Sequence, residues 1–127
     1  MSDNPKSSDV LDTMFRDTCV YWAPSGNVDN NGQVIFSEPV EISCRWVESN
    51  EFYLDTKTGT EQISRAKVRL PESVTLLGVL WHGSLDDIAT GSDEDPFLNR
   101  GAWEIRSTKF IPDFENQKTL YIAWLNR

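Results

Sequence analysis

Two stretches of alternating residue type, separated by a turn sequence, most constrain what this chain can fold into. Apolar and polar residues alternate over 40–46, and in 61–70 charges alternate with positions that become progressively more apolar, Ile63 excepted. A period of two indicates a β-strand with one buried and one solvent-facing side. Gly59 lies between the two runs, where a hairpin requires a positive φ angle. The two strands are therefore expected to pair antiparallel across a long hairpin.

Further short runs of strand character occur along the chain. They cover residues 18–23, 33–36, 76–81, 102–110 and 120–125. The segment 24–32 contains Pro, Gly and Asn-Gly turn signals and is expected to be a loop. About seven short strands with such turns predict an antiparallel all-β fold. A length of 127 residues is that of one domain, which we expect over 17–127, after an arm or short helix over 1–16.

The alternation phase within each strand also predicts the hydrophobic core. The residues expected there are Ile42, Cys44, Trp46, Ala66, Val68, Leu70, Leu80, Ile105, Ile122 and Trp124. In the run 120–125 both faces are apolar, which predicts a central strand and not an edge strand.

The charge balance argues against one class of function. The chain has 12 Lys and Arg against 20 Asp and Glu, a net charge of −8. Non-specific affinity for nucleic acid comes mainly from Lys and Arg, so tight DNA binding is not expected and a role near DNA would be steric. No membrane-length apolar run and no signal peptide is present, which predicts synthesis in the cytosol. In that reducing compartment Cys19 and Cys44, which could face one another, are expected to be buried thiols.

Few groups in the sequence are suited to catalysis. The single histidine, His82, has no second His or Cys at ligand spacing. The acidic segment within 86–100 carries Asp86, Asp87, Asp93, Glu94 and Asp95, without the residue pattern of a calcium-binding loop. We therefore predict a protein that is not an enzyme and that uses no metal and no cofactor. The segment itself is expected to be a long surface loop without secondary structure of its own.

A basic stripe lies on one of the two central strands. Arg65, Lys67 and Arg69 occupy its solvent-facing positions. Two interpretations remain open: a solvated face paired with Glu41 across the hairpin, or a contact surface for an acidic neighbour. Exposed ion pairs contribute little to stability, so stability does not decide between them.

Three segments together resemble a known family of virion proteins. They are DTCVYWAPSGNVDNNGQVIFSEPVEISCRW at 17–46, DTKTGTEQISRAKVRLPESVTLLGVLW at 55–81 and AWEIRSTKFIPDFENQKTLYIAWL at 102–125. This pattern resembles the head-closure (stopper) proteins of tailed bacteriophages, which form a ring at the head–tail connector. The resemblance implies a small antiparallel SH3-like β-barrel over 17–127 that assembles as a cyclic homo-oligomer in the virion neck. Its partners would be adaptor or portal proteins, tail proteins and, by steric contact, the packaged DNA.

In that family a connection between two barrel strands projects toward the channel and helps to retain DNA. The resemblance places this closure role on Asn50, Glu51, Tyr53, Asp55, Lys57 and Gly59, within the segment 49–60. An ordinary hairpin end is the alternative. Because Phe52 and Leu54 continue the alternation, we expect the segment to extend as a two-stranded arm, which needs something to pack on. Contacts between subunits of a ring need two different patches, and the basic stripe and the acidic segment are the candidates.

Three other functions remain open at this stage. The chain could be a tail-terminator or adaptor subunit of the same neck, which its purified binding partner would reveal. It could instead be a monomeric β-barrel binding module or a small antagonist of a host enzyme, which would be absent from the virion. A metal-dependent hydrolase built on His82 and the acidic segment would contain bound metal, which elemental analysis detects.

Overall fold

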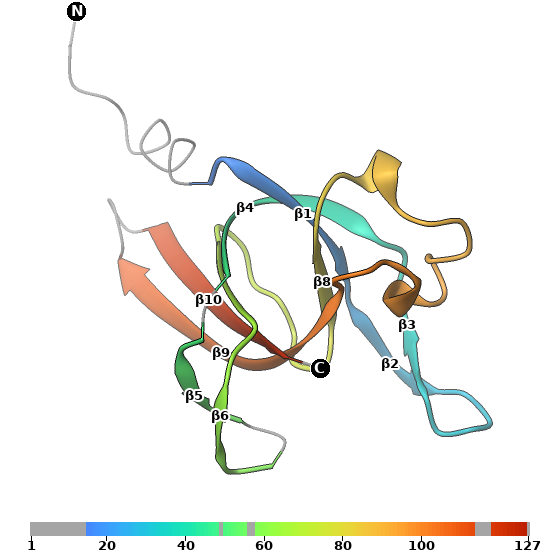
Figure 1. Ribbon diagram of the computed structural model, residues 1–127, viewed down its shortest axis with the longest axis horizontal. Helices are drawn as coiled ribbons and strands as arrows, with labels where there is room; N and C mark the ends of the chain where they lie inside the picture. The colour runs from blue at the N-terminus through green and yellow to red at the C-terminus, as the bar shows by residue number, and fades with distance from the viewer. Residues whose placement is uncertain (1–14, 49, 56–57, 114–117, 127) are drawn as a thin grey trace, which may run out of the picture.

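A computed structural model describes residues 15–48, 50–55, 58–113 and 118–126. Six strands close into an antiparallel barrel, which confirms the predicted all-β fold (Figure 1). In the order in which they neighbour one another around the barrel, they are β1 (Asp17–Trp22), β4 (Val40–Glu48), β7 (Ala66–Leu70), β10 (Lys118–Asn126), β9 (Trp103–Asp113) and β8 (Val79–His82). Closure leaves no free edge in this sheet, which removes the site at which edge-to-edge aggregation begins.

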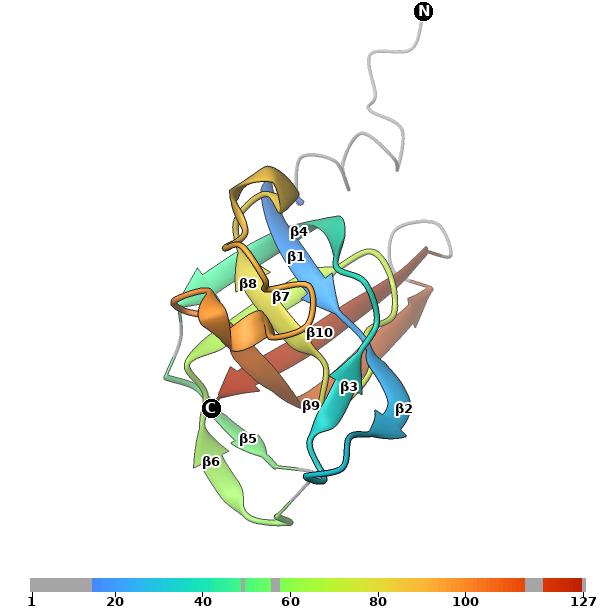
Figure 2. The same cartoon turned by 90° about the vertical axis from the view of Figure 1, so that its right-hand side faces the viewer.

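Two hairpins and a loop are attached to the barrel (Figures 1 and 2). One hairpin joins β2 (Pro24–Val28) to β3 (Val34–Phe36), and the other joins β5 (Phe52–Leu54) to β6 (Glu61–Ile63). In Figure 1 both hang from the lower part of the barrel, on opposite sides. The long loop between β8 and β9 contains two short 3-10 helices, η1 (Leu85–Asp87) and η2 (Pro96–Leu98).

The barrel interior is filled mainly by residues at alternate strand positions. The buried set inside the barrel is Cys19, Tyr21, Ile42, Cys44, Trp46, Ala66, Val68, Leu70, Val74, Leu80, Ile105, Ala123 and Leu125. Two smaller clusters lie elsewhere in the fold, one containing Val20, Trp22, Val79 and Ala102 and the other containing Phe15, Leu120 and Ile122. The predicted pairing of the two central strands is confirmed, because Trp46 of β4 lies opposite Val68 of β7. Nine of the ten predicted core residues are buried.

The core prediction is wrong for the tenth residue, Trp124. Trp124 is only partly buried and packs against the Phe15 cluster, because Ala123 and Leu125 are the β10 residues that face the barrel interior. Both faces of this strand are apolar, so alternation could not decide which one points inward. The ammonium of Lys67 lies 5.7 Å from the centre of the Trp124 ring.

The structure corrects three further expectations. The segment 24–32 is not all loop, since Pro24–Val28 forms β2, and the strand expected at 76–81 begins at Val79. The single strand expected over 61–70 is two strands, because the backbone N–H of Ser64 donates to Glu51 while that of Arg65 donates to Leu125. The chain thus changes partner from the hairpin to the barrel at this point. The expected arm or helix over 1–16 lies outside the described residues up to 14.

Candidate functional site

The β5–β6 hairpin, residues 50–63, forms the two-stranded arm that the sequence predicts. Its register places Phe52 opposite Ile63 and Tyr53 opposite Gln62. Phe52, Leu54 and Ile63 are 66%, 62% and 48% exposed, so the outer side of the arm is apolar. Two sequence signals mark this apolar side: Phe52 and Leu54 continue the alternation of the first run, and Ile63 breaks the alternation of the second.

The inner side of the arm is fixed to the barrel by a buried ion pair. Asp55 is fully buried and accepts a hydrogen bond from Arg106 Nε of β9 at 3.1 Å. Arg106 Nη1 also donates to Glu104 at 2.7 Å. Burial acts to lower the pKa of Arg106, but the hydrogen bond to Glu104 and the charges of Asp55 and Glu104 outweigh burial and raise it. Arg106 therefore stays charged and anchors the arm through charge-assisted hydrogen bonds.

A second set of polar contacts joins the arm to the end of the barrel. The side-chain amide of Asn126 donates to the hydroxyl of Tyr53 at 3.3 Å and to the carbonyl of Ile63 at 3.0 Å. At the tip, the N–H of Gly59 donates to the carbonyl of Asp55 at 2.7 Å, and Gly59 has a φ of 74°. This is the positive-φ turn predicted at Gly59. Asn126 thus joins both strands of the arm to β10, and the hydrogen bond of Gly59 closes the turn within the arm.

The predicted closure residues divide between the two sides of the arm. Asn50, Glu51 and Gly59 are exposed, whereas Tyr53 and Asp55 are buried against the barrel. Lys57 lies outside the described residues. The large exposed side chains of this arm include Phe52 and Leu54, which were not among the predicted closure residues. Sequence reasoning also missed Arg106 and Asn126, whose contacts come from strands distant in the sequence.

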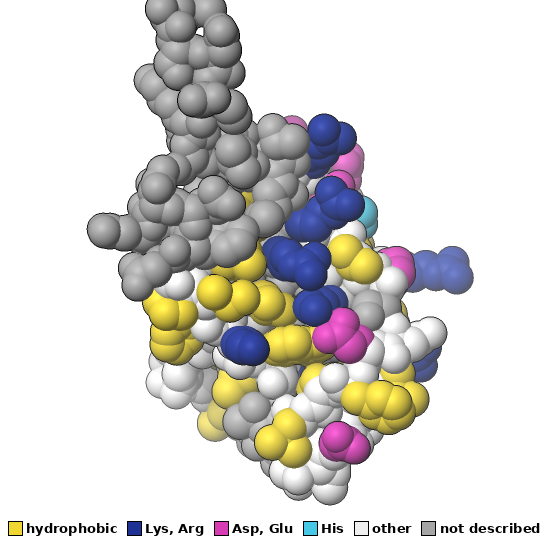
Figure 3. Space-filling model, turned by 90° about the vertical axis from the view of Figure 1, so that its left-hand side faces the viewer, with side chains coloured by type: hydrophobic (Ala, Val, Ile, Leu, Met, Phe, Trp, Pro, Cys, Tyr) yellow, Lys and Arg dark blue, Asp and Glu magenta, His cyan; other side chains and the backbone are white. Residues whose placement is uncertain are grey.

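The basic stripe lies on the outer face of β7, beside a further cation on β4. Arg45 of β4 is opposite Arg69 of β7 in the strand register. Lys67 donates to Glu51 at 3.1 Å, and the guanidinium of Arg65 lies 5.9 Å from the centre of the Trp103 ring. Figure 3 shows a row of basic side chains on this side of the molecule. We call Arg45, Arg65, Lys67 and Arg69 the basic face.

The structure overturns the pairing of the stripe with Glu41. Glu41 instead accepts a hydrogen bond from the backbone N–H of Leu85 at 2.9 Å. Arg45 was not among the predicted interface residues, although its place between buried Cys44 and Trp46 signals an outward side chain. Only the register of the barrel brings it opposite Arg69.

The acidic segment is an ordered loop, contrary to the expectation of a loop without secondary structure. The indole N–H of Trp22 donates to the carbonyl of Ser92 at 2.8 Å, and Asn99 accepts from the N–H of Ala89 at 2.7 Å. Pro96 is buried at the start of η2. These anchors fix the loop while all five of its predicted carboxylates stay exposed; they are Asp86, Asp87, Asp93, Glu94 and Asp95.

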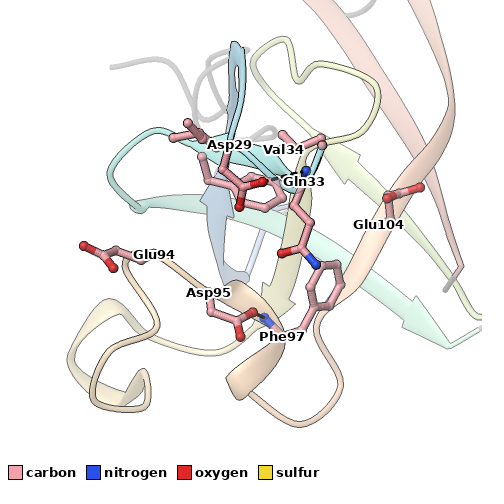
Figure 4. Close-up of a pocket in the computed structure, with 10 residues that line it drawn as sticks. Asp29, Gln33, Val34, Glu94, Asp95, Phe97 and Glu104 are labelled. Atoms are coloured by element: carbon pink, nitrogen blue, oxygen red, sulfur yellow. Dashed lines mark hydrogen bonds between the residues drawn. The ribbon is translucent and has the colours of Figure 1, made fainter.

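A groove of about 930 Å³ separates this loop from the β2–β3 hairpin (Figure 4). Asp29, Glu94, Asp95 and Glu104 line it together with Phe97. Asp29 accepts hydrogen bonds from the N–H groups of its own turn, and Asp95 accepts from the N–H of Phe97 at 3.2 Å. Glu104 pairs with an arginine, and Glu94 points away from the other labelled side chains in Figure 4. The hydrogen bonds of three of these carboxylates thus serve the fold.

His82 and the two cysteines have structural surroundings. The ring of His82 stacks on Trp46, with centroids 5.1 Å apart and planes at 13°. Cys19 and Cys44 are free and fully buried, as predicted. A side-chain hydrogen bond with Cys44, together with burial, raises the pKa of Cys19, which keeps this thiol protonated. Among the described residues, no group of three or more His, Cys, Asp or Glu is placed to hold a metal ion.

Comparison with protein-family models, with curated proteins and with solved structures finds no match to this chain. Within the described part of the chain, no helix has the length and hydropathy needed to cross a membrane.

Proposed function

We propose that this protein is a subunit of the neck of a tailed bacteriophage. A ring of copies would close the DNA exit after packaging and offer the surface to which the tail attaches. The resemblance of residues 17–125 to head-closure proteins is the starting point. The observation that carries the proposal is the arm: a ribbon with an apolar outer side that is anchored to the wall of a small barrel by an ion pair.

The arm is built to contact something outside its own barrel. Two strands of three residues each are too short to be stable without packing partners. The ion pair between Asp55 and Arg106 supplies that support on the inner side only. The outer side leaves Phe52, Leu54 and Ile63 in solvent, an arrangement that favours a further contact. In a ring, the next subunit is available to provide it.

The charge distribution is consistent with a passage for DNA. A net charge of −8 repels the phosphate backbone, so a duplex in the channel would slide until the arms obstruct it. The acidic segment within 86–100, which we call the acidic loop, is opposite in charge to the basic face. Contacts between neighbours in a ring require two such different surfaces.

The test removes the arm and leaves the barrel intact. Glu48 and Ala66 are opposite one another in the register, so an Asn-Gly turn can replace residues 49–65 between them. We expect this variant to fold, because the closed barrel keeps all six strands. In a phage lacking the wild-type copy, it should yield heads that lose DNA or fail to join tails, so that full, tailed particles fall at least a hundredfold.

The deletion also removes one cation of the basic face, so Arg65→Ala serves as the matched control. Arg65→Ala measures the share of the loss that comes from this cation, and it should reduce particle numbers far less than the deletion does. Electron microscopy of the particles and measurement of packaged DNA provide the readout. Normal numbers of full, tailed particles from the folded armless protein would contradict the closure role of the arm and redirect attention to the loop at 85–100.

A further inference from the structure

The basic face contains two arginines whose charges have no partner within the described residues. Arg45 and Arg69 are opposite one another on adjacent antiparallel strands, where Cα atoms are about 4.5–5.5 Å apart. The ion pairs found in the described chain involve Lys67 and Arg106 and reach neither arginine. Like charges in directly opposite positions destabilise a sheet. An external anion bound between the two guanidinium groups would remove this repulsion.

The chemistry of this face favours carboxylates over a long polyanion. Guanidinium groups bind carboxylates through paired hydrogen bonds. The patch is short, since Glu41 lies at one end of β4 and Glu48 at the other. The net charge of −8 adds a long-range repulsion for nucleic acid. A short acidic protein segment is therefore the ligand that fits.

The acidic loop of the same chain is such a segment. Its carboxylates are exposed, and its backbone is held in place by Trp22, Ser92 and Asn99, so little conformational entropy is lost when it binds. In the barrel order, the loop follows β8, which lies three strands from β7 on the opposite side of a six-stranded barrel. The start of the loop contacts β4 of its own copy, since the N–H of Leu85 donates to Glu41, yet no ion pair among the described residues joins a carboxylate of the loop to Arg45 or Arg69. A second copy is therefore the partner that can bring these carboxylates to both arginines.

We propose that Arg45 and Arg69 bind the acidic loop of a neighbouring copy, in a head-to-tail contact. This proposal rests on the ring assembly proposed above and names the contact that builds it. Because the two surfaces differ, one copy uses its basic face for one neighbour and its acidic loop for the other. The contact is electrostatic and should weaken as salt screens it.

Single and paired charge reversals test this contact by analytical ultracentrifugation of the full chain. Arg45→Glu/Arg69→Glu should weaken self-association at least tenfold at low salt. Asp86→Lys/Asp87→Lys and Asp93→Lys/Glu94→Lys reverse the loop and should each weaken it. An equimolar mixture of the arginine variant with one of the loop variants restores opposite charges at every contact and should recover assembly. Glu38→Lys, a charge reversal at an exposed residue outside the basic face and the loop, is the control and should leave self-association unchanged.

Thermal melting separates a binding role from a structural one. Arg45→Glu alone places opposite charges across the two strands, so its melting temperature should rise slightly while self-association falls. A purely structural arginine would lower both.

Four results would overturn the proposal. Three concern assembly: a wild-type chain that stays monomeric, self-association unaffected by the arginine reversal, or mixtures that never recover it. The fourth is loss of DNA binding in the arginine variant, which would assign the face to nucleic acid. Particles that still require the arm under any of these results would leave the neck function standing.

Discussion

Truncation of Trp46 to alanine is expected to lower the free energy of unfolding by about 3–5 kcal/mol, the range for emptying a large aromatic site in a packed core. Trp46 is 7% exposed and belongs to the cluster inside the barrel. Its indole N–H donates to Glu48, and its ring stacks on His82. Urea denaturation followed by circular dichroism would measure the change.

Trp124→Ala is the matched control for this measurement. Trp124 is partly exposed outside the barrel interior, and its buried indole N–H has no hydrogen-bond partner in the described structure. Truncation of Trp124 should lower the free energy of unfolding by only about 1–2 kcal/mol. Its ring buries less apolar area than that of Trp46, and no hydrogen bond of its indole N–H is lost. Equal losses for the two variants would mean that the assignment of inner and outer faces is wrong.

Replacement of Arg106 by methionine should lower the free energy of unfolding by about 3 kcal/mol, because it leaves the fully buried carboxylate of Asp55 without its cation. The figure is at the low end for buried pairs because the side chain of Arg106 is 16% exposed. The melting temperature should fall by roughly 10 °C in a domain of this size. Hydrogen exchange should accelerate most in β5 and β6, whose anchor is lost.

The double variant Asp55→Asn/Arg106→Met shows whether the loss of stability comes from the charge of Asp55 once Arg106 is absent. Asparagine keeps the shape of the side chain and removes the charge, so the double variant should be more stable than Arg106→Met alone. If the double variant loses the sum of the two single effects, the ion pair is not coupled and another contact holds the arm. The role of Asp55 and Arg106 as the anchor of the arm would then be wrong.

The anchored arm gives these measurements a functional meaning. An arm held by Asp55 and Arg106 keeps Phe52 and Leu54 in one orientation, ready to contact a neighbour without further ordering. Loosening the arm without unfolding the barrel should therefore impair assembly before it impairs folding. Arg106→Met tested at a temperature below its melting transition can separate the two effects.

The alternation of residue types in the sequence determined which face is buried in the strands that have one solvent-facing side. In β4 and β7, charges on one face leave a single choice for the buried face, so Ile42, Cys44, Val68 and Leu70 could be assigned to the core. Gly59 could be assigned to the turn because few residues other than glycine adopt its φ of 74° at low cost. The acidic residues within 86–95 could likewise be assigned to the surface, because ionised carboxylates need no protein partner to remain in water.

Only the tertiary structure decided which face of β10 points inward, because Leu120, Ile122 and Trp124 are as apolar as the residues between them. The same holds for the burial of Asp55, whose partner Arg106 is 51 positions away. Arg45 and Arg69 meet because barrel closure fixes the register of β4 against β7, and no local signal carries that register. Contacts across such separations depend on how all six strands close together, and that geometry belongs to the whole fold.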